Sequence, residues 1–113
     1  MSMRWNLALC VLSVVSSVVG SAAAADADGA AAYRQNCVAC HGEKADGQGP
    51  AAAALRPRPT DLTQASYWAE RSDEQVVATI RAGRPGTPMM PYDALADAEL
   101  AALVAWLRSQ AAG

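Results

Sequence analysis

The segment Cys37-Val38-Ala39-Cys40-His41 places two thiols and an imidazole within five residues, and it restricts the possible folds more than any other feature of the chain. On a helix, thiols three residues apart lie on adjoining turns, with the imidazole of the next residue beside them. The chain has no other histidine, and its third cysteine, Cys10, lies in an amino-terminal segment that we expect to be removed. A group held by this C-x-x-C-H motif must therefore take any further ligand from a residue of another type.

Several kinds of site contain a C-x-x-C pair. A thioredoxin-like redox site places the pair in a βαβ unit, and the sequence has almost no strand signal. A structural zinc site requires four ligands, but the chain offers no further His and, after residue 25, no further Cys. A simple disulfide leaves the adjacent histidine unexplained. Because C-x-x-C-H is the attachment motif of c-type haem, we predict one haem c, bound covalently through Cys37 and Cys40, with His41 as an axial ligand of the iron.

Residues 1–25 have the layout of a secretory signal peptide. A basic residue, Arg4, precedes an apolar stretch of 13 residues, 7–19, and the small residues 20–25 follow. Cleavage after Ala24 or Ala25 would leave a mature domain of residues 26–113. The alternative is an uncleaved membrane anchor, but the apolar stretch is shorter than the ~20 residues that span a bilayer. We expect export to the periplasm and no membrane span in the mature form.

The mature chain is poor in large aliphatic side chains. From Asp26 onward it has 22 alanines but only 11 valine, isoleucine and leucine residues in total, and it has no phenylalanine. A domain of this size commonly needs a metal, a disulfide or a cofactor to stabilise it. The composition therefore excludes a self-sufficient enzyme with a large core, and it agrees with a cofactor that fills the centre of the fold.

The mature chain is predicted to be all-helical, because no segment alternates apolar and polar residues as a half-buried strand does. A first helix is expected from about Asp28 to Cys40, with Asp26 or Asp28 as its N-cap and Gly42 as its stop signal. Glycines and prolines interrupt residues 42–65, which are expected to form a long loop. A loop of this length is tolerable in a small domain only if it packs on something other than protein.

Two further helices are predicted. Ser72 and Gln75 have the spacing of a capping box, so a helix is expected to begin there and to end at Gly83. The last helix is expected over residues 98–110, with Asp97 as its N-cap. The apolar face of this last helix consists of Leu100, Leu103, Val104 and Leu107.

The second axial ligand cannot be another imidazole, because the chain has no histidine besides His41. The position is left for Met, Lys, the chain terminus or water, or it stays open. Outside the leader the methionines are Met89 and Met90, which lie in the segment 83–92, where three prolines and two glycines exclude a helix. Methionine is a usual axial ligand of haem iron, so one of these two side chains is the expected second ligand.

The ordered set of motifs resembles a class I c-type cytochrome, specifically the small bacterial kind with a single haem. The resemblance covers nearly all of residues 28–110. It rests on residues 37–42, on Gly49-Pro50, on the Pro-Gly-Thr-Pro-Met segment 85–89, and on residues 95–107. It implies an all-α fold in which three main helices and their loops surround one covalent haem.

The resemblance also implies roles for individual residues. Cys37 and Cys40 would form thioether bonds to the haem, and His41 would be the proximal ligand. The carbonyl of Pro50 would accept a hydrogen bond from Nδ1–H of His41, a contact that fixes the orientation of the ring.

A crossing of the first and last helices is implied as well. Gly29 and Tyr33 look like the glycine and the aromatic residue that cross the last helix at Leu103 and Trp106 in relatives. The absence of a side chain at Gly29 would permit close approach, so these residues are expected to be structural.

Two registers fit the methionine ligand. In the segment 85–89 the ligand is Met89, and the aromatic Tyr92 follows three residues later, as in many relatives. The equally familiar Met-Pro pair points to Met90 instead. We favour Met89 and keep Met90 as the alternative.

The predicted function is outer-sphere electron transfer rather than enzymatic catalysis. Ligation by His and Met raises the reduction potential of haem iron and blocks both axial positions. The sequence shows no paired carboxylates in a defined site, no activated nucleophile and no phosphate-binding glycine loop. We expect a periplasmic monomer that shuttles single electrons between a respiratory donor, such as a reductase or dehydrogenase, and an oxidase or terminal reductase.

Charge narrows the choice of partners. The leader contains one of the 9 basic residues and none of the 11 acidic ones, so 8 positive charges face 11 negative ones in the mature chain, about −3 in total. No basic stripe typical of a nucleic-acid-binding protein is present. Lys44 is the only lysine, so the lysine-ringed docking face of mitochondrial relatives is absent. Arg56 and Arg58 either pair with a haem propionate, mark a partner surface or are solvated loop charges.

Two alternative functions remain open. In the first alternative, the chain is a dedicated haem subunit of a larger oxidoreductase. In the second, it is a haem-based redox or gas sensor whose methionine ligand is labile. Co-purification with a large partner would indicate the first alternative, and rapid binding of carbon monoxide to the reduced protein would indicate the second.

Overall fold

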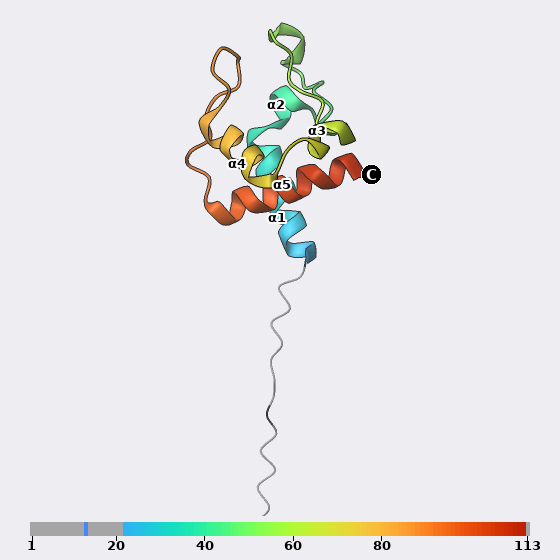
Figure 1. The fold of residues 1–113 in the computed structure, drawn as a ribbon, viewed down its shortest axis with the longest axis vertical. Helices are drawn as coiled ribbons and strands as arrows, with labels where there is room; N and C mark the ends of the chain where they lie inside the picture. The colour runs from blue at the N-terminus through green and yellow to red at the C-terminus, as the bar shows by residue number, and fades with distance from the viewer. Residues whose placement is uncertain (1–12, 14–21, 113) are drawn as a thin grey trace, which may run out of the picture.

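The computed structural model describes residue 13 and residues 22–112, and all regular structure in that part of the chain is helical (Figure 1). The elements are α1 (Ala22–Asn36), α2 (Val38–His41), the 3-10 turn η1 (Ala52–Ala54), α3 (Ala65–Ala69), α4 (Asp73–Ala82) and α5 (Asp97–Ala112). The predicted all-α class is confirmed. None of the described helices is long and apolar enough to cross a membrane. The predicted signal peptide lies mostly outside the described residues, so its boundary stays a prediction.

Helices α1 and α5 cross at close range, with α5 running across α1 in the view of Figure 1. A Cβ atom at Gly29 of α1 would lie 2.2 Å from the carbonyl oxygen of Ala102 of α5. One turn along α1, the ring of Tyr33 packs against the ring of Trp106, with centroids 4.6 Å apart. The close contact that the sequence predicted at Gly29 and Tyr33 is present, and Ala102 and Trp106 are the residues that meet Gly29 there.

Helix α4 begins with the predicted capping box. The Ser72 hydroxyl accepts a hydrogen bond from the Gln75 amide at 3.2 Å, and the Gln75 side chain accepts one from the Ser72 amide at 2.9 Å. Gly83, with a φ of 69°, follows the last helical residue, as predicted. Side-chain hydrogen bonds therefore set the start of α4, and the backbone freedom of glycine sets its end.

The apolar core lies between α5 and the other helices. The predicted face of α5 is buried in full, namely Leu100, Leu103, Val104 and Leu107. Val76 and Ile80 of α4 are buried against the same cluster, together with Tyr33, Leu62 and Trp68. Few large side chains thus form the core, as the composition predicted.

The first helix differs from the predicted one at both ends. It begins at Ala22, so neither Asp26 nor Asp28 is its N-cap. The alanine run before Asp26 explains the extension, because alanine has the highest helix propensity. At the other end the helix breaks at Cys37, whose φ and ψ are −123° and −25°, and α2 follows as a separate turn. Gly42 ends α2, as predicted for the end of the first helix.

The predicted N-cap of α5 is wrong by one residue, because Asp97 is already helical. Its carboxylate forms an ion pair with Arg81 of α4 instead of capping α5. The residue before it, Ala96, has no side-chain acceptor. The Glu99 carboxylate instead accepts a long hydrogen bond from the Ala96 amide, at 3.4 Å.

Helix α3 was not predicted, and η1 interrupts the predicted loop 42–65. Both elements are too short to produce a helical repeat of apolar residues. Helix α3 matters for the core, because it buries Trp68, whose indole Nε1–H donates to the carbonyl oxygen of Leu62 at 2.9 Å.

Candidate functional site

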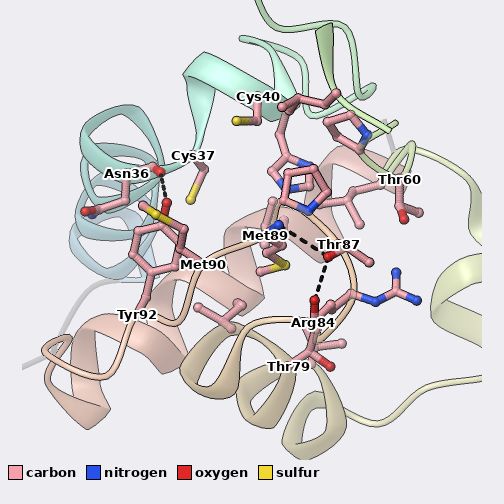
Figure 2. Close-up of a pocket in the computed structure, with 18 of the residues that line it drawn as sticks. Asn36, Cys37, Cys40, Thr60, Thr79, Arg84, Thr87, Met89, Met90 and Tyr92 are labelled. Atoms are coloured by element: carbon pink, nitrogen blue, oxygen red, sulfur yellow. Dashed lines mark hydrogen bonds between the residues drawn. The ribbon is translucent and has the colours of Figure 1, made fainter. Parts of the chain in front are cut away.

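A cavity of about 290 Å³ collects the main residues that the sequence indicated (Figure 2). Cys37, Cys40 and His41 contribute to one wall, and Met89 and Met90 come from the loop after α4. Apolar side chains from three other parts of the fold complete much of the lining, among them Leu62, Val76, Ile80 and Leu107. The long loop after α2 lines the cavity with its residues 55 and 57–60, and its residues Ala45 and Leu62 are buried in the core.

The loop 45–51 folds back over α2 and holds its carboxyl end in place. The amides of residues 47, 49 and 51 donate to the carbonyl oxygens of residues 41, 40 and 39, at 2.8, 3.1 and 2.9 Å respectively. Gly49 lies so close to α2 that a Cβ atom would be 2.4 Å from the Ala39 carbonyl oxygen. Because a helix end leaves these carbonyls without partners inside the helix, the loop satisfies them and fixes the backbone that carries Cys40 and His41.

The imidazole of His41 is half-buried in the cavity wall. Burial lowers the pKa of His41 below its ordinary value, although the nearby Thr60 backbone opposes the shift. The ring is therefore neutral near pH 7, which is the form that binds metal. Its Nδ1 atom is buried and has no hydrogen-bond partner among the described residues.

The hydrogen bond that the family resemblance implied between the Pro50 carbonyl and His41 is not formed among the described residues. Pro50 is exposed and does not line the cavity. Pro50 lies in the loop 45–51, next to the closely packed Gly49. Nδ1 of His41 is thus left with unused hydrogen-bonding capacity, and the Pro50 contact stays a prediction.

Cys37 and Cys40 are free thiols, both half-buried at the cavity. Burial and the neighbouring Cys40 raise the pKa of Cys37 to about 11, so this thiol is protonated near pH 7. Figure 2 shows the two side chains on the pocket side of this segment, Cys37 directly before α2 and Cys40 within it. The two thiols are thus free to form bonds to one group inside the cavity.

Met89 and Met90 differ in exposure. Met89 is half-buried and packs against the core, whereas Met90 is 64% exposed. In Figure 2 the thioether of Met89 lies in the middle of the pocket, and Met90 lies beside Tyr92. This difference favours the Met89 register, although both side chains line the cavity and the assignment stays a prediction.

Two arginines bring positive charge to the cavity, and none of the described lining residues is acidic. Arg58 was a candidate from the sequence, whereas Arg84 was missed, although it stands directly before the Pro-Gly-Thr segment. Arg56 does not line the cavity, and its guanidinium donates to the carbonyl oxygens of residues 53 and 55, at 3.0 and 2.7 Å. Cations in an otherwise apolar wall suit a ligand with a hydrophobic body and acidic groups.

A small helical domain that surrounds an apolar cavity with a C-x-x-C-H motif and a methionine loop has the architecture of a haem-binding electron-transfer protein. The Cytochrome c family model matches residues 27–111. The chain belongs to the cytochrome c family.

Two solved structures show how far the likeness extends. The KustC0563 c-type cytochrome is 30% identical with a TM-score of 0.59, and the match covers 74% of this chain and 96% of that one. A chain of the Kuenenia stuttgartiensis reducing HAO-like protein complex Kustc0457/Kustc0458 is 27% identical with a TM-score of 0.64. That match covers 74% of this chain but 41% of the other, so this chain spans less than half of its length. A comparison with curated proteins finds no match.

The cofactor of the family is covalent haem c, and the described residues fit it. Two free thiols, a neutral imidazole with a buried and unpartnered nitrogen, and a thioether face one apolar cavity. Cys37 and Cys40 are the thiols of the C-x-x-C-H motif at which the family attaches its haem. The family and the residues at the cavity thus agree on one redox group, a covalent c-type haem.

Proposed function

We propose that this protein is a periplasmic carrier that moves single electrons between a respiratory donor and acceptor, with His41 and Met89 as the ligands of its haem. The observation that carries the proposal is the meeting of Cys37, Cys40, His41 and Met89 at one cavity. The signal-peptide pattern of residues 1–25 supports export. When bound, the haem supplies an iron that alternates between Fe(II) and Fe(III).

The residues of the chain give this group its properties. His41, through its neutral imidazole, and Met89, through its thioether, would hold the iron, and the soft thioether ligand would favour the reduced state. The apolar lining limits access of water, which also raises the reduction potential. With His41 and Met89 both bound to it, the iron would have no open position for oxygen or substrate, and the protein would exchange electrons only.

The proposal is tested on the exported protein by mass spectrometry and visible spectroscopy in both redox states. We expect a mass that shows loss of the leader and gain of one haem. We also expect a charge-transfer band from methionine to ferric iron in the oxidised protein. A mass without haem, or rapid binding of carbon monoxide by the reduced protein, would contradict the proposal, and the second result would support a sensor.

A second candidate is a dedicated haem subunit of a larger oxidoreductase. It is favoured by one observation, the likeness to a chain of a reducing HAO-like protein complex. The carrier is favoured by the match to almost the whole of a c-type cytochrome chain. Size-exclusion chromatography of extract from the native cells separates the two, because a carrier elutes as a small protein and a subunit elutes with its enzyme.

A further inference from the structure

The loop 84–92 carries both methionines and is closed by hydrogen bonds of its own. The Thr87 hydroxyl donates to the Arg84 carbonyl oxygen at 2.7 Å and accepts a bond from the Met89 amide at 3.3 Å. The Arg84 amide donates to the Met89 carbonyl oxygen at 3.3 Å. The loop therefore has a defined shape, and its position over the cavity depends on the contacts that join it to the rest of the fold.

Two hydrogen bonds of Tyr92 provide such contacts. The Tyr92 amide donates to the carbonyl oxygen of Ile80 on α4, at 2.9 Å. The Tyr92 hydroxyl donates to the carbonyl oxygen of Asn36 at 3.0 Å, across 56 residues of sequence (Figure 2). Within residues 22–112, the second bond is the only hydrogen bond between the loop and the segment 36–41. It therefore joins the methionine side of the cavity directly to the C-x-x-C-H side.

The position of Tyr92 suits this role. Its side chain is half-buried, lines the cavity and packs against the core. Its acceptor belongs to the last residue of α1, directly before Cys37. At the other end of the loop, Gly83 leaves α4 with a positive φ of 69°, and a Cβ atom there would lie 2.8 Å from the Met89 carbonyl oxygen. The loop is thus confined at Gly83 and bonded across the cavity at Tyr92.

We propose that the Tyr92 hydroxyl, through its hydrogen bond to the Asn36 carbonyl, holds the loop 84–92 closed and so keeps Met89 at the haem iron. This inference rests on the proposed His41 and Met89 ligation. Tyr92 is a positioning residue, because it acts on the ligand through the backbone of the loop. A phenylalanine would keep the ring and its packing and would lose only the bond.

The expected effect follows from the populations of the closed and open loop. Loss of one partly buried hydrogen bond is worth about 1 kcal/mol, which raises the population of the open loop about fivefold. An added ligand such as imidazole binds the iron only when Met89 has left it. Its apparent affinity therefore rises by the same factor as the open population.

The test compares the wild-type holoprotein with Tyr92→Phe. Imidazole is titrated into the ferric protein and its binding is followed by loss of the methionine-to-iron band, while hydrogen exchange reports on the amides of residues 84–92. We expect about fivefold tighter imidazole binding and faster exchange in the loop, with haem content unchanged. Ser109→Ala is the matched control, because it removes a hydroxyl bond of 2.6 Å to the Trp106 carbonyl on an exposed part of α5. This control is expected to bind imidazole like the wild type.

Two results would overturn the inference. The first leaves the proposed Met89 ligation intact, and the second refutes that ligation as well. If the wild type shows the methionine band and Tyr92→Phe matches it in imidazole affinity and loop exchange, the role of Tyr92 is refuted and the ligation stands. If the wild type lacks the band, the Met89 ligation itself fails, and the role of Tyr92 in holding that ligand fails with it.

Discussion

The hydroxyl of Tyr33 donates a hydrogen bond to the carbonyl oxygen of Gly42, the residue that follows His41. Tyr33 is 1% exposed and Gly42 is buried, so this bond lies in the interior. Burial raises the pKa of Tyr33 far above its ordinary value, so the hydroxyl keeps its proton and remains a donor. The bond joins the last turn of α1 to the end of α2 and thereby supports the backbone that carries His41.

Replacement of Tyr33 by phenylalanine is expected to lower the free energy of unfolding of the holoprotein by about 1 kcal/mol, because it removes one of the two hydrogen bonds that the buried Gly42 carbonyl accepts and leaves the bond from the Ala45 amide at 3.2 Å. Unfolding by guanidinium chloride measures the change. Tyr67→Phe is the control, since the structure shows no hydrogen bond from the Tyr67 hydroxyl to any described residue. If both variants lose the same stability, the bond to Gly42 contributes nothing of its own.

Replacement of Gly29 by alanine is expected to destabilise the protein by about 1–3 kcal/mol, as overpacking does at tightly packed positions. The added Cβ would lie 2.2 Å from the Ala102 carbonyl oxygen, which is too close without separation of α1 and α5. The sign of the change is the test, since helix propensity alone predicts that Gly29→Ala stabilises α1 by about 1 kcal/mol.

The control for this prediction is Ala31→Gly, at an exposed position of the same helix. It should cost about 1 kcal/mol through propensity alone. Thermal unfolding of the two variants therefore distinguishes the effect of helix propensity on stability from the effect of the contact between α1 and α5. A gain in stability for Gly29→Ala would show that the two helices move apart without cost.

Local chemistry explains which elements the sequence predicted correctly. Ser72 and Gln75 bond each other's backbone across three residues, so their spacing alone identifies the start of α4. The apolar residues of α5 recur with helical spacing over two turns, so their pattern also predicts this helix. Asp97 was misplaced because its partner, Arg81, lies on another helix and takes the carboxylate away from the cap. Helix α3 is too short to show a repeat, and its stability comes from the burial of Trp68.

In the candidate site, too, some features could be predicted from the sequence and others depend on the folded structure. Chemistry and spacing identified Cys37, Cys40 and His41. The two methionines were identified because residues 26–113 contain no others. The sequence contained no sign that Tyr92 bonds the carbonyl of Asn36, since a backbone carbonyl has no residue-specific signature. The difference in exposure between Met89 and Met90 also depends on the folded loop, because the two residues are neighbours in the chain.

Removal of the haem attachment is expected to abolish the fixed tertiary structure. A double variant, Cys37→Ser with Cys40→Ser, leaves the apolar cavity to water, and residues 26–113 contain only 11 valine, isoleucine and leucine residues to stabilise the fold. We expect loss of the near-ultraviolet circular dichroism signal and of slow hydrogen exchange in α5, relative to the holoprotein. Cooperative unfolding of the double variant with protected core amides would show that the protein fold is self-sufficient.

Leucine substitutions at Met89 and Met90 identify the second axial ligand, because leucine keeps the volume of methionine and removes its sulfur. Met89 is half-buried at the cavity and Met90 is 64% exposed, so Met89→Leu is expected to abolish the charge-transfer band and lower the reduction potential. Met90→Leu serves as the matched control and should change neither property. The opposite pattern would assign the ligand to Met90, and a band that persists in both variants would mean that neither methionine is the ligand.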